Sequence, residues 1–129
     1  MIGYVMVGTN NLDRAATFYD SVLTPLDLIQ VERTSTYVAF APKAAKGDIE
    51  FYVTKPFDKR PAKPGNGIMV ALQAASMQAL ERFHSSGLKS GGIDEGAPGP
   101  RDEGSKTCYA YIRDLDGNKI CAFCDAINA

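Results

Sequence analysis

Hydrophobic and polar positions alternate along this chain in two different rhythms. Apolar residues recur at spacings of three and four in residues 11–24 and 76–90, which predicts two amphipathic helices. Asn10-Asn11 and Ser76 precede these segments and are typical helix N-caps. Shorter apolar runs bounded by turn residues predict strands. They cover residues 2–7, 28–33, 37–41, 48–54, 68–73, 93–97, 107–113 and 119–125.

The predicted elements follow one order twice, β-α-β-β-β and then β-α-β-β-β again. We therefore expect a single α+β domain over residues 1–129, built from two paired βαβββ units. The first unit covers about residues 1–55 and the second about residues 68–126. Residues 55–67 hold three prolines and two glycines, which predicts a linker that crosses the surface.

Composition excludes several classes of function. Apolar residues make up 45% and charged residues 22% of the 129 residues, and the formal net charge is −1. This is the composition of a soluble globular domain, and its charge gives no reason to expect nucleic acid as a partner. No apolar run is long enough to cross a membrane. The densest basic group is predicted to be a solvated loop; it consists of Lys55, Lys59, Arg60 and Lys63.

The three cysteines indicate reduced thiols rather than a redox or zinc site. The first residues lack a basic segment and a cleavage site, so we expect no signal peptide and a cytoplasmic location. Cys121 and Cys124 have C-x-x-C spacing, but on a strand they point to opposite faces. No second cysteine or histidine pair completes a zinc site, so structural thiols are the favoured interpretation.

Several short motifs together resemble one superfamily. Residues 11–19 (NLDRAATFY) are similar to the D-L-x-R-S-x-x-F-Y start of its first helix. Residues 80–84, 91–92 and 96–101 are similar to the second half of bacterial glyoxalase-like proteins. Residues 114–120 (DLDGNKI) resemble its D-P-D-G-N-x-I turn, with Leu115 in place of proline. The chain thus resembles the vicinal-oxygen-chelate superfamily, which includes glyoxalase I, bleomycin-resistance proteins, fosfomycin-resistance enzymes and extradiol dioxygenases.

The resemblance implies an architecture and a set of candidate site positions. Its members pair βαβββ units into two curled mixed sheets that face one another around a cleft. Metal-using members place divalent-ion ligands on the first and last strands of each unit, pointing into the cleft. Carried over to this sequence, those ligand positions fall on Tyr4, Glu50, Met69 and Cys121.

These four residues are a poor ligand set for a hard divalent ion. Only the Glu50 carboxylate is a plausible oxygen ligand. A phenol is a poor ligand at neutral pH because phenols in general have a pKa near 10, which disfavours Tyr4, and the Met69 thioether and Cys121 thiol are soft ligands. We therefore predict no cofactor and no conventional metal site. Zinc is the favoured exception, because thiolate and carboxylate are both acceptable to it.

The cleft lining predicts the function. Aromatic and sulfur-bearing side chains favour a small organic ligand, and the predicted ligand-binding residues are Tyr4, Glu50, Tyr52, Met69, Cys121 and Phe123. Three alternatives stay open. They are a lyase or dioxygenase with a degenerate metal site, metal-free acid–base catalysis by Glu50 and Tyr4, and a scaffold whose own side chains fill the cleft. Glu50 faces either the cleft or solvent. Superfamily members of this size imply a homodimer.

Two other features have simpler interpretations. His84 is the single histidine, and its spacing from Leu80 and Leu88 places it on the apolar face of the second helix, which favours packing over catalysis. Asp114, Asp116 and Asn118 resemble part of an EF-hand calcium loop. In such a loop starting at Asp114, however, Gly117 falls at position 4 instead of 6, and position 12 holds Asp125 instead of glutamate. A hairpin turn is the favoured interpretation.

Overall fold

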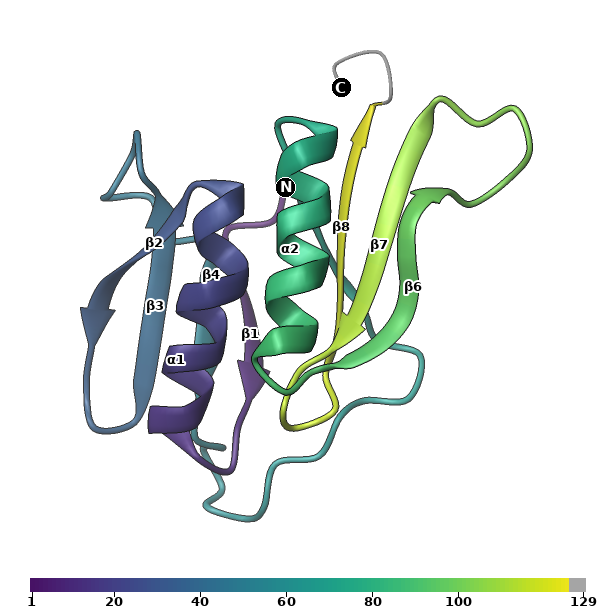
Figure 1. Cartoon of the computed structure of the whole chain (residues 1–129). Coiled ribbons are helices and arrows are strands. Elements are labelled where there is room, and N and C mark those ends of the chain that lie inside the picture. Colours follow the sequence, from purple (N-terminus) through teal and green to yellow (C-terminus); the bar gives the residue numbers. More distant parts are fainter. Residues whose placement is uncertain (126–129) are drawn as a thin grey trace.

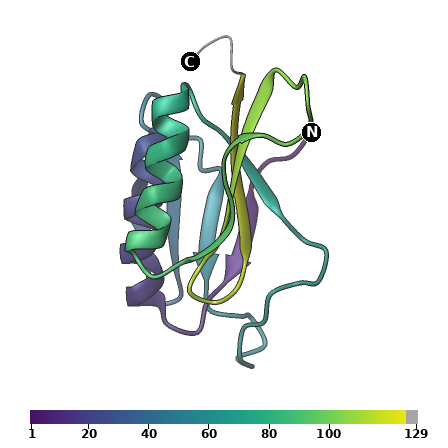
Figure 2. The same cartoon turned by 45° about the vertical axis from the view of Figure 1, so that its right-hand side comes forward.

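Two α-helices cover one side of two four-stranded sheets in the computed structural model, which describes residues 1–125 (Figures 1 and 2). The first sheet has the strand order β1-β4-β3-β2. Its elements are β1 (Val5–Gly8), α1 (Leu12–Leu23), the short 3₁₀ helix η1 (Thr24–Leu26), β2 (Leu28–Arg33), β3 (Tyr37–Pro42) and β4 (Phe51–Thr54).

The second half of the chain repeats this arrangement, with the strand order β5-β8-β7-β6. Its elements are β5 (Val70–Gln73), α2 (Met77–Lys89), β6 (Ile93–Pro100), β7 (Thr107–Arg113) and β8 (Lys119–Asp125). In each half the first strand pairs in parallel with the last, and the other pairings are antiparallel. The sheets are therefore mixed and not closed, and the predicted α+β fold of two βαβββ units is confirmed.

The predicted element boundaries need some correction. Asn11 and Ser76 are the N-caps, and their side chains accept hydrogen bonds from the backbone N–H groups three residues later. Residues 48–50, predicted to be strand, precede β4, and residues 2–4 and 68–69 likewise precede β1 and β5. Conversely, the predicted strand over 93–97 continues to Pro100. The last residue of the predicted second unit, 126, and residues 127–129 lie outside the described part.

The core lies between the helices and the sheets because every second strand residue points toward the helices. On the first sheet Val38, Phe40, Phe51 and Val53 are completely buried. The second sheet contributes its own alternating set, Cys108, Ala110, Ile112, Ile120, Ala122 and Cys124. Both helices add their apolar faces to one continuous core. In the described part of the chain, neither helix is long and apolar enough to cross a membrane.

The turn between β7 and β8, residues 114–118, joins the two halves through polar contacts. The buried Asp114 carboxylate accepts hydrogen bonds from the backbone N–H groups of Asp116 (2.9 Å) and Asn118 (2.8 Å). Its other oxygen accepts from the Tyr19 hydroxyl on α1 and from the Asn118 amide (2.9 Å). The same amide donates to the Gly8 carbonyl at 2.9 Å, at the end of β1. The predicted turn is confirmed, and it is also an inter-unit contact.

Gly92 allows a close approach that a larger residue would prevent. A Cβ atom there would lie 2.8 Å from the carbonyl oxygens of both Arg113 and Gly87, and 3.1 Å from a Phe18 ring carbon. We expect Gly92→Ala to lower the free energy of unfolding by about 1–3 kcal/mol, because backbone atoms cannot move aside as a flexible side chain would. Urea unfolding followed by circular dichroism measures this effect.

Gly47 is the matched control for this substitution, because a Cβ there would meet no atom within 4 Å. Gly47→Ala should stay within about 0.5 kcal/mol of the wild type. Equal stability of the two variants would show that α2 and β7 do not pack as closely as described.

Candidate functional site

The side of the first sheet turned away from the helices, here called the first open face, carries a tyrosine cluster. The Tyr52 ring lies between two others, with ring centroids 4.9 Å from Tyr4 and 5.4 Å from Tyr37, both edge-on. Tyr52 points to this side because its neighbours Phe51 and Val53 both point into the core. Met6 pairs with Tyr52 across β1 and β4 and extends the cluster.

The corresponding side of the second sheet, the second open face, carries an aromatic ladder. The Tyr109 ring stacks on Tyr111 at 6.1 Å and lies 6.2 Å from Phe123 on the paired strand. The Lys119 ammonium stands 5.3 Å from the centroid of the Tyr111 ring. Five of the six tyrosines of the chain thus lie on the two open faces. Tyr37, Tyr109 and Tyr111 were not among the residues predicted from the sequence, although each alternates with a core position.

The structure places Tyr4 and Glu50 at neighbouring backbone positions just before β1 and β4. The Val5 N–H donates to the Glu50 carbonyl at 3.0 Å. Tyr4 is 57% exposed, and Glu50 is also exposed. Glu50 lines a cavity of about 220 Å³ together with Gln73 of β5, so it lies where the two units approach each other.

Met69 and Cys121 have opposite environments. Met69 precedes β5, is 42% exposed and lines a cavity of about 200 Å³ with Arg113 and Lys119. Cys121 is fully buried, although it lies on the open-face side of β8, opposite Tyr111. Burial, which penalises the charged thiolate, raises the pKa of Cys121 to about 11. Without a bound metal ion, Cys121 is therefore a neutral thiol at physiological pH and a poor nucleophile.

His84 and the other cysteines have structural environments. His84 is buried on α2, and its Nε2 lies 2.9 Å from Asp94 Oδ1. That hydrogen bond is the main reason why the pKa of Asp94 is lowered. Cys108 and Cys124 are cross-strand neighbours in the helix-side core, and all three cysteines are free and buried. These surroundings agree with the packing roles predicted from the sequence.

A cavity of about 830 Å³ lies between the linker and one end of the first open face. We call it the linker cavity; its lining consists of Met6, Thr9, Asn10, Thr36, Thr54, Lys55, Pro56, Phe57, Lys59, Arg60 and Pro61. The cavity was not predicted from the sequence, which indicated only a solvated loop for this basic, proline-rich stretch. Its basic side chains are exposed as expected, but they surround a concave surface.

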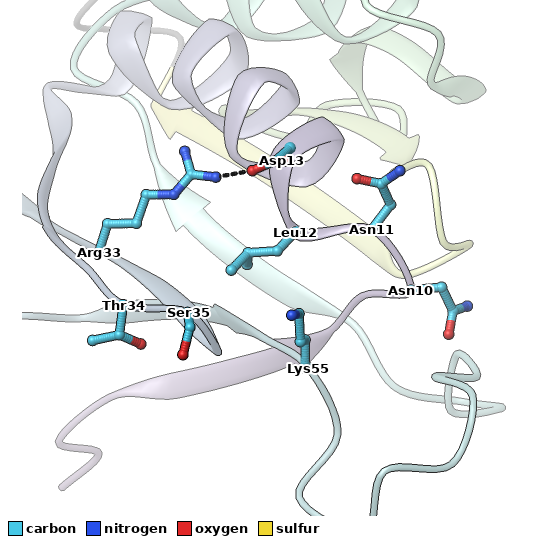
Figure 3. Close-up of a pocket in the computed structure, with 8 residues that line it drawn as sticks. All are labelled: Asn10, Asn11, Leu12, Asp13, Arg33, Thr34, Ser35 and Lys55. Atoms are coloured by element: carbon cyan, nitrogen blue, oxygen red, sulfur yellow. Dashed lines mark hydrogen bonds and ion pairs between the residues drawn. The ribbon is translucent and has the colours of Figure 1, made fainter.

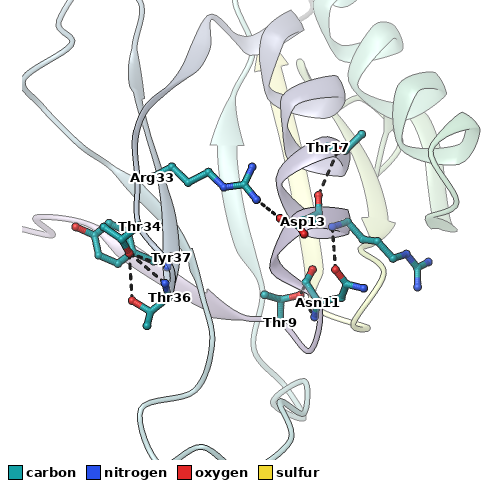
Figure 4. A network of polar contacts seen from close by, with 9 residues as sticks. Thr9, Asn11, Asp13, Thr17, Arg33, Thr34, Thr36 and Tyr37 are labelled. Carbon is teal, nitrogen blue, oxygen red and sulfur yellow. Dashed lines mark hydrogen bonds and ion pairs between the residues drawn. The ribbon is translucent and has the colours of Figure 1, made fainter.

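A second cavity, of about 430 Å³, lies between the start of α1 and the turn that joins β2 to β3 (Figure 3). An ion pair between Arg33 and Asp13 crosses it. The surrounding polar contacts stabilise the helix start and the β2–β3 turn, and the Arg33–Asp13 ion pair connects the two (Figure 4). The Thr34 hydroxyl accepts from the backbone N–H groups of Thr36 and Tyr37, both at 3.2 Å. The charge of Arg33 is therefore already paired with that of Asp13 within this cavity.

Comparison with known proteins agrees with the geometry. The model of the Glyoxalase/Bleomycin resistance protein/Dioxygenase superfamily matches residues 1–122. The chain therefore belongs to this superfamily. A glyoxalase/bleomycin resistance protein from Albidiferax ferrireducens T118 is 35% identical, with a TM-score of 0.83 over 95% of this chain and 97% of that chain. Among curated proteins, none matches this sequence.

More distant superfamily structures share the fold alone. A family enzyme from Burkholderia phytofirmans PsJN is 13% identical, with a TM-score of 0.70 over 94% of this chain and 95% of that chain. A V278E mutant of glyoxalase I from Zea mays is 20% identical, with a TM-score of 0.71. The match to the maize protein covers 97% of this chain but only 46% of the maize chain.

The residues at the superfamily's metal-ligand positions do not fit a divalent ion. Cys121 is completely buried and offers a soft sulfur, Met69 offers a soft thioether, and phenols such as the Tyr4 side chain are generally weak ligands for such ions. This leaves the Glu50 carboxylate, whereas a stable site needs at least three protein ligands. Within residues 1–125, no group of three or more His, Cys, Asp or Glu side chains is arranged to hold a metal ion.

We therefore expect purified protein to hold far less than a stoichiometric amount of Mg²⁺, Mn²⁺, Fe²⁺, Ni²⁺ or Zn²⁺ after dialysis, as measured by elemental analysis. The triple variant Tyr4→His, Met69→His, Cys121→Glu should gain a divalent ion, because it restores imidazole and carboxylate ligands. Circular dichroism checks its fold, and the double variant Tyr4→His, Met69→His replaces it if the buried glutamate prevents folding. A stoichiometric ion in the wild type would contradict the ligand assignment.

Proposed function

We propose that this protein binds a small organic molecule on its open sheet faces without a conventional metal site. The observation that carries the proposal is the concentration of aromatic side chains on those faces, with Tyr52 and Phe123 among them. Aromatic rings offer large apolar area with few rotatable bonds, and their hydroxyl groups give direction to a polar ligand group. Planar organic molecules match both properties.

The positions of the predicted ligand-binding residues refine this proposal. Tyr4 and Tyr52 touch one another and present their rings together. Cys121 lies beneath the aromatic ladder and shapes its floor, since no part of it is exposed. Met69 stands at the edge, half-exposed beside Lys119. Contacts with the ligand therefore come from Tyr4, Tyr52, Phe123 and Met69.

A second candidate function is metal-free acid–base catalysis by Glu50 and Tyr4. The observation in its favour is the β1–β4 register, which puts the two residues at adjacent backbone positions. A carboxylate beside a phenol can exchange a proton with a bound substrate if both groups reach it. Loss of turnover in Glu50→Gln with unchanged ligand affinity would favour this candidate over simple binding.

We further propose a homodimer in the cytoplasm. Large apolar side chains are exposed around the starts of β1 and β5, including Ile2 (83%), Tyr4 (57%) and Ile68 (64%). Exposed apolar side chains near unpaired sheet edges favour association. A second copy would cover them and close the open faces around a ligand.

The proposed location in the cytoplasm rests on the cysteines, because three free, buried cysteines suit a reducing compartment.

Tyr52→Ala should weaken binding of a neutral planar probe, 2-naphthalenemethanol, by about fivefold, because one aromatic contact contributes about 1 kcal/mol. Protein-detected NMR titration measures the affinity and locates the shifts. The matched control is Leu88→Ala on α2, which removes a 38% exposed apolar side chain far from the open faces. Shifts confined to residues away from both open faces would refute the proposal.

Light scattering at micromolar concentration should report twice the 13.9 kDa chain mass. Ile68→Asp should favour the monomer, because a charge would be buried at the proposed contact. Leu88→Asp adds the same charge on the exposed surface of α2 and should leave the dimer intact. A monomeric wild type would show that the open faces are not covered by a second copy.

A further inference from the structure

The linker cavity has a fixed wall, because the linker is attached to the first unit at a defined point. The Asn10 side chain binds both backbone groups of Ala62. Its amide donates to the Ala62 carbonyl at 3.1 Å, and its oxygen accepts from the Ala62 N–H at 2.7 Å. Gly8 lets the linker approach closely, since a Cβ there would lie 3.2 Å from the Ala62 Cβ. The cavity is therefore formed before any ligand arrives.

The linker also has a defined local shape between β4 and this attachment. The Lys59 N–H donates to the Pro56 carbonyl at 3.1 Å, and the Arg60 N–H donates to the Asp58 carboxylate at 3.0 Å. Lys59 has a positive φ of 63°. Prolines 56 and 61 further restrict the backbone. These features hold the side chains of residues 55–57 and 59–61 around the cavity.

The charges lining the linker cavity are all positive. Lys55, Lys59 and Arg60 contribute three cations, and no carboxylate is among the lining residues. The nearest acidic residue in the sequence, Asp58, does not line the cavity and accepts the Arg60 N–H instead. Three cations around one concave surface create a positive potential that attracts an anion.

The remaining lining is largely apolar. Met6 is 50% exposed and Phe57 is fully exposed, and prolines 56 and 61 stand beside them. An exposed phenylalanine ring contributes no packing to a solvated loop, whereas a ligand with an apolar body would bury that ring. Thr36 and Thr54 add hydroxyl groups to the lining, and the Thr54 hydroxyl already donates to the Lys55 carbonyl at 2.9 Å.

We propose that the linker cavity binds an organic anion, a carboxylate or phosphate monoester with an aromatic or aliphatic body. The basic side chains hold the anionic group, and Met6 and Phe57 cover the apolar body. This site goes beyond the proposed function, because it shares only Met6 and Thr54 with the first open face. Either site could be occupied without the other.

The test compares three probes that share one ring system: 2-naphthoate, 2-naphthyl phosphate and neutral 2-naphthalenemethanol. In NMR titrations of the wild type, at least one anion should bind more than tenfold tighter than the neutral probe to the linker cavity, with shifts at Lys55, Phe57 and Arg60. Raising the salt concentration should weaken that binding. The tighter of the two anions identifies the carboxylate or the phosphate as the preferred group.

The variant Lys55→Gln, Lys59→Gln, Arg60→Gln should lose at least tenfold in anion affinity while its affinity for the neutral probe stays unchanged. The control Lys46→Gln, Arg82→Gln, Lys106→Gln removes the same net charge from exposed positions outside the cavity. It should bind the anions as the wild type does.

Equal weakening in both triple variants, equal binding of anionic and neutral probes, or an absence of anion-induced shifts at Lys55, Phe57 and Arg60 would each overturn the proposal. Failure of the proposed open-face function gives a different result. In that case the neutral probe would not shift the NMR signals of Tyr4, Tyr52 or Phe123, whether or not the anions bind at the linker cavity.

Discussion

The buried carboxylate of Asp114 is the interaction on which the arrangement of the two units depends. A carboxylate that is only 4% exposed is costly unless its oxygens are hydrogen-bonded, and here both are. Two of its donors belong to its own turn backbone, while the Tyr19 hydroxyl belongs to the other unit. Burial, followed by the nearby Asp114 charge, raises the pKa of Tyr19 well above its usual value, so the phenol keeps its proton and donates.

The positions of both candidate sites follow from this turn. Asn118 donates to the Gly8 carbonyl, and the Asp116 carboxylate accepts the Asn10 N–H at 2.9 Å, so the turn fixes the chain between β1 and α1. Asn10 in turn holds the linker at Ala62. One continuous set of hydrogen bonds therefore runs from the hairpin of the second unit to the wall of the linker cavity. It also sets how the two open faces lie relative to each other.

Local patterns allowed the fold to be predicted, because helix spacing, N-caps and strand alternation act over a few residues. Asn11, Ser76 and the turn at 114–118 were identified in this way. The site was less predictable, because its properties arise between distant residues. Cys121 is buried by neighbours on β7, and the linker becomes a cavity wall through Asn10, 52 residues from Ala62. Nothing in a proline-rich stretch specifies that partner.

A double-mutant cycle on Tyr19 and Asp114 tests this account most directly. Tyr19→Phe, Asp114→Asn and the double variant are compared with the wild type by urea unfolding. We predict that the two substitutions are not additive, with a coupling energy of about 1–3 kcal/mol, because Tyr19→Phe removes the donor and Asp114→Asn replaces the charged acceptor of the same buried hydrogen bond. A coupling energy near zero would contradict it, since the Tyr19–Asp114 hydrogen bond would then contribute nothing to holding the two units together.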